Sequence, residues 1–236
     1  GASNTAVGFN ALDANTTANS NTAVGTHALS ANTTGTTNVA VGAFALEDNS
    51  TANNNSALGY RAARNLTTGS ENTAIGRSAL DTSTTAASCT AIGYQAMYYN
   101  TDGGENTAVG KNALMNNTTA HFNTAVGYHS LLSNTTGQFN VAVGSLALDA
   151  NTTANSNIAV GYLAVSSNTT GHDNIGMGYS ALTANTTGDN NVSIGSYSLD
   201  ANTTGANNTA LGKSALGANT TGTENVAVGK DALLSS

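Results

Sequence analysis

The acidic side chains are the first candidates for chemistry. Glu71 and Glu105 each directly precede Asn-Thr-Ala, so they are equivalent residues of an internal repeat, and Asp173 and Asp189 lie in successive copies of it. Two carboxylates about 6.5–9.5 Å apart are the catalytic pair of an inverting glycosidase. A ligand site also needs a concave wall, and no inserted segment interrupts this chain to build one. We therefore interpret these acids as solvated edge residues and expect no enzyme activity.

Histidine and cysteine offer little more. His121 and His172 are separated by three copies of the repeat, and His27 and His129 by six. Such separations are too long for a shared metal, so we expect exposed histidines and neither metal nor cofactor. The single cysteine, Cys89, has no histidine or acid fixed beside it, which favours a buried inert thiol over a nucleophile.

Tyrosines recur in every second copy, at Tyr60, Tyr94, Tyr128 and Tyr162. An aligned row of tyrosines has two interpretations. It is either a surface stripe that contacts sugars or a packed edge that shields the chain or an interface between chains. The triplet Asn32-Thr33-Thr34 and its copies have the form of glycosylation acceptors. A ladder of turn residues would have the same residue types, so glycosylation sites and turn residues both remain as interpretations.

All these spacings derive from one repeat. A glycine follows Asn-Thr-Ala-Val or a close variant in every copy, and the copies keep a strict 17-residue period without insertion or deletion. The glycines are Gly8, Gly25, Gly42, Gly59, Gly76, Gly93, Gly110, Gly127, Gly144, Gly161, Gly178, Gly195, Gly212 and Gly229. A fixed period of this kind identifies a repeat architecture.

The residue types decide between helix and strand. Asn, Thr and Gly are poor helix formers, and each copy contains an invariant glycine and usually a Thr-Thr pair. Thr22 and Val24 alternate around Ala23 with the period of two that marks a strand. We predict an all-β parallel β-solenoid with 17-residue coils, about 14 coils over residues 1–236, forming a single repeat domain.

Stacked coils place equivalent residues in ladders about 4.8 Å apart. We expect the branched aliphatic residues to form the core ladder: Val7, Val24, Val41, Leu12, Leu29 and Leu46. The strictly small Ala23 and Ala28 positions must face a close neighbour, either the opposite wall of the coil or another chain. Gly8 and Gly25 fit turns that need positive φ or close backbone approach. Asn21 and Asn38 fit turns in which asparagine tolerates left-handed geometry and forms amide ladders between coils.

Charge excludes several partners. Charged residues make up 8% of the chain and the net charge is −7, which argues against nucleic acid and anionic membranes. No apolar run reaches the length of a membrane span, so we expect no membrane insertion. Neither end of the array has a polar cap, and one slender coil buries little apolar surface. We therefore expect lateral self-association, and continuation of the repeat in a longer fibre.

The motif Asn-Thr-Ala-Val-Gly resembles the head repeats of YadA-like trimeric autotransporter adhesins. Its tyrosine form, as in Tyr94 to Met97 and Tyr179 to Leu182, is also similar to repeat arrays of phage-type tail fibres. The resemblance implies a left-handed β-roll, a parallel homotrimer and an extracellular location on a cell surface or virion. The 17-residue period is longer than the one usual in the adhesin heads.

The function expected from these features is structural and adhesive. A rigid repetitive scaffold would present variable corners to a surface glycan or host receptor, and segments would associate as a trimer and could join end to end as a filament. The alternatives are an ice-binding solenoid that uses ladders of Thr33 and Thr34, and a polysaccharide-degrading tailspike-like enzyme. Only one of two adjacent threonine ladders on a strand can face outward, which makes ice binding secondary.

Overall fold

The computed structural model describes residues 1–234, which divide into two compact units, Gly1–His121 and residues 122–234. Each described unit is all-β and contains one short strand in every 17-residue coil. The first unit contains β1 (Thr5–Val7), β2 (Thr22–Val24), β3 (Val39–Val41), β4 (Ser56–Leu58), β5 (Thr73–Ile75), β6 (Thr90–Ile92) and β7 (Thr107–Val109). The second contains β8 (Thr124–Val126), β9 (Val141–Val143), β10 (Ile158–Val160), β11 (Ile175–Met177), β12 (Val192–Ile194), β13 (Thr209–Leu211) and β14 (Val226–Val228).

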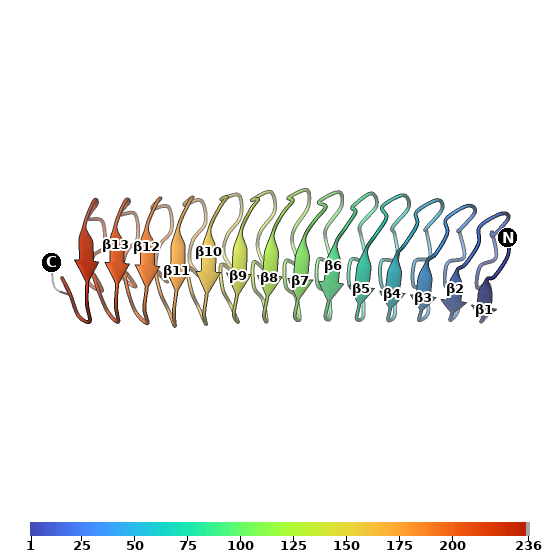
Figure 1. The fold of residues 1–236 in the computed structure, drawn as a ribbon, viewed down its shortest axis with the longest axis horizontal. Coiled ribbons are helices and arrows are strands. Elements are labelled where there is room, and N and C mark those ends of the chain that lie inside the picture. Colours follow the sequence, from blue (N-terminus) through green and yellow to red (C-terminus); the bar gives the residue numbers. More distant parts are fainter. Residues whose placement is uncertain (235–236) are drawn as a thin grey trace. The chain divides into compact units, whose positions relative to one another are not determined.

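Within each unit the strands pair in sequence order, all parallel and all in register (Figure 1). Val7 pairs with Val24, and Val24 with Val41, so each step along the sheet is one 17-residue repeat. The same shift holds in the second unit, where Val143 pairs with Val160. The prediction of a parallel β-solenoid with 17-residue coils is confirmed.

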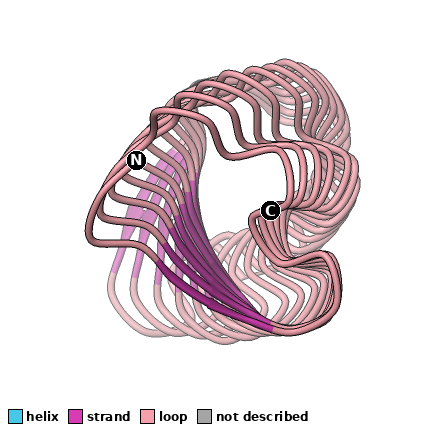
Figure 2. Cartoon of the chain, turned by 90° about the vertical axis from the view of Figure 1, so that its right-hand side faces the viewer, coloured by secondary structure: helices cyan, strands magenta, loops and turns pink. Residues whose placement is uncertain are grey.

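The remainder of each coil is also hydrogen-bonded to its neighbours, although it has no strand geometry. The strands form one wall, and turns and bends complete the circuit (Figure 2). Leu29 N–H donates to the Ala45 carbonyl at 3.0 Å, and Thr33 N–H donates to the Ser50 carbonyl at 3.0 Å. Successive coils are thus joined along their whole contour, which satisfies backbone groups that a loop would otherwise leave to water.

The interior is lined by the small residues and the leucines. Ala23, Ala28 and Leu29 are fully buried, as are most of their equivalents in the described coils. Gly176 replaces the strand alanine in one coil, and a Cβ built there would meet the Val165 side chain and the Ala181 carbonyl. The alanine positions therefore face the opposite wall of the same chain, which was one of the two predicted neighbours.

Half of the predicted core ladder is wrong. Leu12, Leu29 and Leu46 are buried as expected. Val7 is 58% exposed, however, and Val24 and Val41 are only half-buried. A three-residue strand can turn either its middle residue or its two outer residues inward. Because leucine from the facing wall fills the narrow interior, only the alanine fits there, and the valines form an outward ladder.

The glycine turns are as predicted. Gly25 has φ of +135°, and Gly8 has φ of +136°. A Cβ on Gly25 would lie 2.6 Å from the carbonyl carbon of Gly42 in the next coil. Both reasons for glycine, positive φ and close approach, therefore apply at this position.

The asparagines do not make left-handed turns, which corrects the expectation for Asn21 and Asn38. The left-handed residues of this coil are instead His27, Leu29 and Thr37, with φ between 52° and 60°. Asn21 and Asn38 are buried, and their side chains connect the coils. Asn21 Nδ2 donates to the Gly35 carbonyl at 2.8 Å, while its Oδ1 accepts from Asn38 N–H at 2.9 Å.

A second amide ladder runs through the Asn32 position. Asn32 Nδ2 donates to the Gly35 carbonyl at 3.0 Å, and Asn49 Nδ2 donates to Asn32 Oδ1 at 3.1 Å. Each unit therefore has an interior that is apolar in the middle and hydrogen-bonded at two flanks. These bonds satisfy most of the amide groups that the narrow coil buries.

Candidate interaction surfaces

The outer sheet face consists of the first and third residues of each strand, which point away from the interior. Its exposed members include Leu58, Ile75, Met177, Ile194 and Leu211, at 37–51% exposure. Three residues and seven strands make this face about 10 Å wide and about 34 Å long in each unit, roughly 340 Å². Apolar patches of that size on soluble proteins are often functional.

The two units differ along this face. In the first unit, threonine or serine occupies most of the first positions: Thr5, Thr22, Ser56, Thr73, Thr90 and Thr107. In the second unit, aliphatic residues occupy most of them: Val141, Ile158, Ile175, Val192 and Val226. The outer sheet face of the second unit is therefore more apolar. With no ionisable group at either strand position, this face offers contact area and no catalytic group.

The aromatic corner follows each glycine and consists of the Thr26 and His27 positions of the repeat. Tyr60, Tyr94, Tyr128 and Tyr162 lie there and are 40–46% exposed. They do not form a bare stripe in the first unit, because Arg77 lies 5.8 Å from the ring centroids of both Tyr60 and Tyr94. These cation–π contacts hold the tyrosine rings against the coil.

Sequence reasoning missed other members of the corner. Phe44 packs edge-on against Tyr60, with ring centroids 5.9 Å apart and planes at 90°. In the second unit Tyr179 stacks on Tyr162 at 5.4 Å and contacts Tyr197 at 5.1 Å. A row of tyrosines every second coil was the signal that we followed. These neighbours lie in the intervening coils or at the adjacent repeat position. Comparing the Thr26 and His27 positions of successive copies together would therefore have predicted them.

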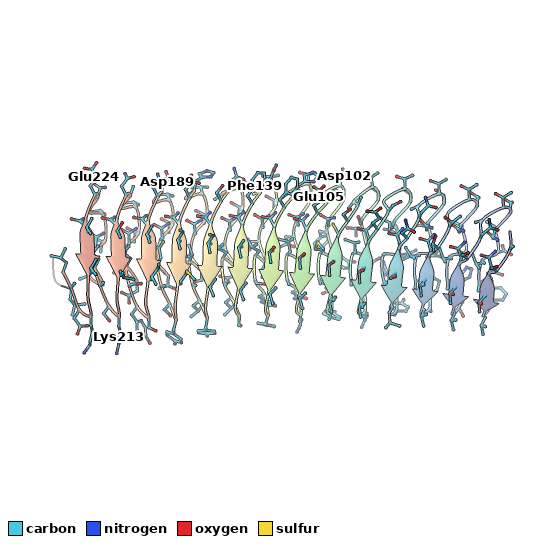
Figure 3. The ribbon with its side chains drawn as sticks, in the orientation of Figure 1. Asp102, Glu105, Phe139, Asp189, Lys213 and Glu224 are labelled. Carbon is cyan, nitrogen blue, oxygen red and sulfur yellow. The ribbon has the colours of Figure 1, made fainter. Side chains whose placement is uncertain are left out.

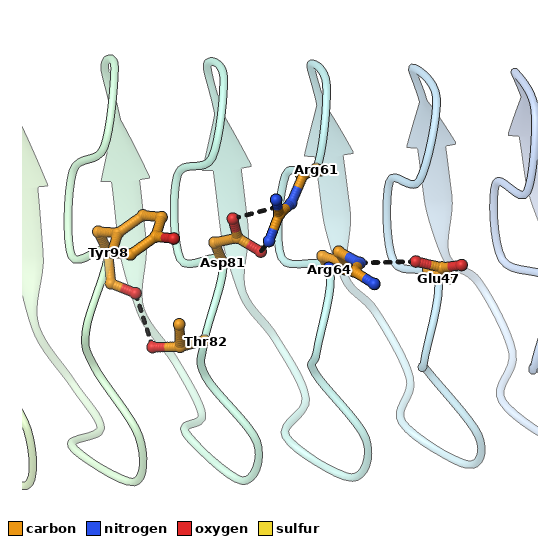
Figure 4. Close-up of polar contacts among 6 residues, drawn as sticks. All are labelled: Glu47, Arg61, Arg64, Asp81, Thr82 and Tyr98. Carbon is orange, nitrogen blue, oxygen red and sulfur yellow. Dashed lines mark hydrogen bonds and ion pairs between the residues drawn. The ribbon is translucent and has the colours of Figure 1, made fainter.

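Two ion pairs join one coil of the first unit to its two neighbouring coils (Figure 4). Arg61 Nε lies 3.2 Å from Asp81 Oδ2, and Arg64 Nε donates to Glu47 Oε2 at 2.7 Å. The carboxylate of Asp81 is buried, and this desolvation raises its pKa even though Arg61 acts in the opposite direction. The hydrogen bond that Arg64 donates to Glu47 raises the pKa of the Arg64 guanidinium.

The acidic corner lies at the Thr36 and Thr37 positions. Asp189, Glu224 and Phe139 follow one edge of the second unit, whereas Lys213 lies on the opposite edge (Figure 3). Glu71 and Glu105 are both exposed, and Glu71 Oε2 accepts from Ser88 Oγ at 3.4 Å. The predicted interpretation as solvated edge residues fits this exposure. Both carboxylates lie where water screens them, and neither faces a cleft described here.

Asp189 and the two histidines of this edge have structural contacts. Asp189 Oδ1 accepts from His172 N–H at 2.6 Å. The Nδ1 atoms of His121 and His172 accept from the backbone of the preceding coil, from Gly104 and Asn155 respectively, at 3.0 Å. His27 instead stacks on Phe44 with centroids 5.6 Å apart. Among residues 1–234 no group of three or more His, Cys, Asp or Glu is placed to hold a metal ion.

Cys89 occupies an asparagine position of the first amide ladder and is buried. Its backbone N–H donates to Asn72 Oδ1 at 2.9 Å, and its Sγ lies 3.3 Å from the Gly103 carbonyl. Burial raises the pKa of this thiol to about 11. A thiol that stays protonated is a poor nucleophile, in keeping with the predicted inert cysteine.

The Asn-Thr-Thr triplets belong to the internal hydrogen-bond network. Asn32 is fully buried and its Nδ2 is engaged, so the folded coil presents no acceptor amide for a glycan. Thr33 Oγ1 donates to the Ser50 carbonyl at 3.1 Å, while Thr34 is exposed. Thr33 and Thr34 lie in a bend outside the strand, and only the second supplies an outward ladder.

No protein-family model matches the chain, and no curated protein or solved structure matches it. In the described part, no helix is long and apolar enough to cross a membrane. The surfaces themselves are therefore the basis for a function.

Proposed function

We propose that this chain is a structural and adhesive fibre segment. Its coils provide a stiff scaffold, and its outer sheet face joins it to further copies as a parallel homotrimer of left-handed β-rolls. The segment belongs to an extracellular adhesin or tail fibre, and its corners meet a surface glycan or receptor.

The observation that carries this proposal is the outward ladder of aliphatic residues. In a sheet with one face in water, inward apolar residues ordinarily alternate with outward polar residues. Here the third strand residue is Val, Ile, Leu or Met in all fourteen coils, although it points away from the interior. In the second unit, where most first strand positions are aliphatic as well, covering this face of roughly 340 Å² would contribute up to about 8 kcal/mol at 25 cal/mol per Å² before the costs of association. A second copy supplies a surface of matching shape and chemistry.

Solution mass tests the association directly. We expect wild-type protein to behave as a trimer in analytical ultracentrifugation and the double variant Val160→Lys/Met177→Lys to behave as a monomer. Both side chains already point outward, so the variant should keep its β-sheet circular dichroism spectrum. Thr204→Lys, an exposed residue outside the sheet face, is the matched control and should leave the trimer intact.

A monomeric wild-type chain at micromolar concentration would contradict the proposed assembly. So would a double variant that remains trimeric. Unfolding of the double variant would contradict the outward placement of these residues.

A further inference from the structure

We propose that the hollow beside Tyr60 in the first unit binds a single uncharged sugar ring. This inference rests on the proposed adhesive role and names the chemistry of one contact. The hollow is lined by Phe44, Tyr60, Arg61 and Arg64, and its volume is about 140 Å³. Sites for drug-sized ligands start at roughly 300 Å³, so this one accommodates one ring and no more.

The apolar part of the site comes from two aromatic rings at right angles. Phe44 and Tyr60 meet with their planes at 90° and their centroids 5.9 Å apart. Arg77 lies 5.8 Å from the Tyr60 centroid, and His27 stacks on Phe44 with their planes 7° apart. Both rings are therefore held in place before a ligand arrives. A pyranose has one face of C–H groups, which packs on such rings and loses water there.

The polar part of the site offers donors and acceptors together. Arg64 uses its Nε for Glu47, and its two Nη groups have no protein partner among residues 1–234. Arg61 is directed towards Asp81 through Nε at 3.2 Å and Nη2 at 3.4 Å, which leaves its Nη1 for a ligand. Glu47 does not line the hollow, but its carboxylate lies 2.7 Å from Arg64 Nε and adds acceptor lone pairs next to that side chain. A sugar hydroxyl both donates and accepts, so it can use both kinds of group.

Charge selects against an acidic ligand. Arg61 and Arg64 are each paired with a carboxylate, Asp81 and Glu47, and Asp48 adds a further acid beside them. The hollow therefore carries no net positive charge, and the chain as a whole carries −7. An anionic sugar would approach a negatively charged protein in which both arginines that line the hollow are already paired with carboxylates. The geometry points to a neutral ring that uses the arginines as hydrogen-bond donors.

The test is titration by ligand-observed saturation-transfer NMR with four probes, the methyl glycosides of glucose, galactose, mannose and N-acetylglucosamine. We expect at least one to bind with Kd of about 1 mM, the affinity that roughly a dozen heavy atoms reach at ordinary ligand efficiency. The methyl glycoside of glucuronic acid should bind at least about 10-fold more weakly than the best neutral probe, because the hollow has no net positive charge.

Two variants assign the binding to this hollow. Tyr60→Ala removes one wall and Arg64→Gln removes the Nη donors, and each should weaken binding by about 10-fold. Tyr162→Ala is the matched control, because Tyr162 has the same repeat position and similar exposure but no arginine in its coil. It should bind the probe as wild type does.

The proposal is overturned if none of the four probes binds, if the glucuronide binds best, or if Tyr162→Ala weakens binding as much as Tyr60→Ala. Sedimentation of the same samples separates this outcome from the proposed assembly. An intact trimer that binds no sugar contradicts only the sugar site, whereas a monomer contradicts the assembly.

Discussion

At the scale of single residues, the coil that contains β4 shows how tightly the interior is filled. In this coil Ala63 occupies the position where most coils have leucine, and Leu66 occupies the asparagine position, both buried. The coil thus keeps one leucine but moves it to a later position in the chain. The exchange also interrupts the second amide ladder, because Leu66 has no Nδ2 to donate. Asn49 Oδ1, which would accept from that position, is buried without a hydrogen-bond partner.

Restoring the usual pair should therefore stabilise the protein. We expect Ala63→Leu/Leu66→Asn to gain about 1 kcal/mol, since the new amide satisfies Asn49 Oδ1. Leu66→Asn alone should lose about 2–4 kcal/mol by leaving a cavity, and Ala63→Leu alone about 1–3 kcal/mol by overpacking. Thermal unfolding of the four proteins as a double-mutant cycle measures the coupling. Additive single effects would contradict the volume exchange.

Two aspartates at the Ser30 position predict a pH dependence. Partial burial raises the pKa of Asp149 and of Asp200, against opposing backbone hydrogen bonds. A raised carboxyl pKa means that the folded state holds its proton more tightly than the unfolded chain does. Its stabilising contribution is then fully present below the unfolded pKa, near 3.8, and is lost as pH rises through the folded pKa.

We therefore expect Asp149→Asn/Asp200→Asn to raise the free energy of unfolding at pH 7 by no more than about 0.5 kcal/mol per site, because both carboxyls are partly exposed and water screens them. The advantage should disappear near pH 3, where the wild-type carboxyls are also neutral. Thermal melts from pH 3 to pH 8 follow the difference. Asp173→Asn, at an exposed edge position, serves as the control for the removal of one surface carboxylate. Equal gains at every pH would argue against a titration effect.

At the scale of the strand, neighbouring residues have opposite environments. Ala142 is fully buried in β9, while Val143, the next residue, is 37% exposed. We expect Ala142→Leu to destabilise the fold by about 1–3 kcal/mol, because the facing wall leaves no room. Val143→Leu adds one methylene group outside and should change stability by about 0.5 kcal/mol or less.

Chemical denaturation of both variants distinguishes the inward position from the outward one. Strand propensity predicts the opposite order, because valine is a better strand former than alanine, so it does not account for a larger loss at Ala142. If the Val143 variant were the less stable, the assignment of the sheet faces would be reversed.

At the scale of the whole molecule, stability should depend on complete coils. Deleting residues 157–173 removes one 17-residue coil and joins two equivalent positions, so every ladder can continue. We expect the β-sheet spectrum to persist and the melting temperature to fall by about 5 °C or less. Deleting only residues 157–165 removes β10 but keeps residues 166–173, which then belong to an incomplete coil.

The shorter deletion should therefore cause the larger loss. It removes the buried residues Ala159, Ala164 and Val165 and leaves backbone donors unpaired on the adjoining coils. Circular dichroism and melting curves compare the two deletion variants. A half-coil deletion as stable as the whole-coil deletion would contradict a fold made of 17-residue layers.

The sequence alone determined the period, the parallel strands, the glycine turns and the buried leucines. An unbroken 17-residue step allows only a stack of equal coils, and Gly25 and Leu29 follow from turn geometry and burial.

The side of the strand that faces inward could not be read from the sequence and follows from the closed coil. Valine is more hydrophobic than alanine, so hydrophobicity placed Val24 in the core, whereas the distance between the two walls leaves room for Ala23 alone. The predicted amide ladders of Asn21 and Asn32 are confirmed, but only the structure shows that these residues are not left-handed turn residues. The hollow beside Tyr60 likewise depends on the side-chain directions of Phe44 and Arg64, which the 17-residue spacing places nearby but does not orient. The distance between the two walls is a property of the closed coil, because residues far apart within one repeat set it together.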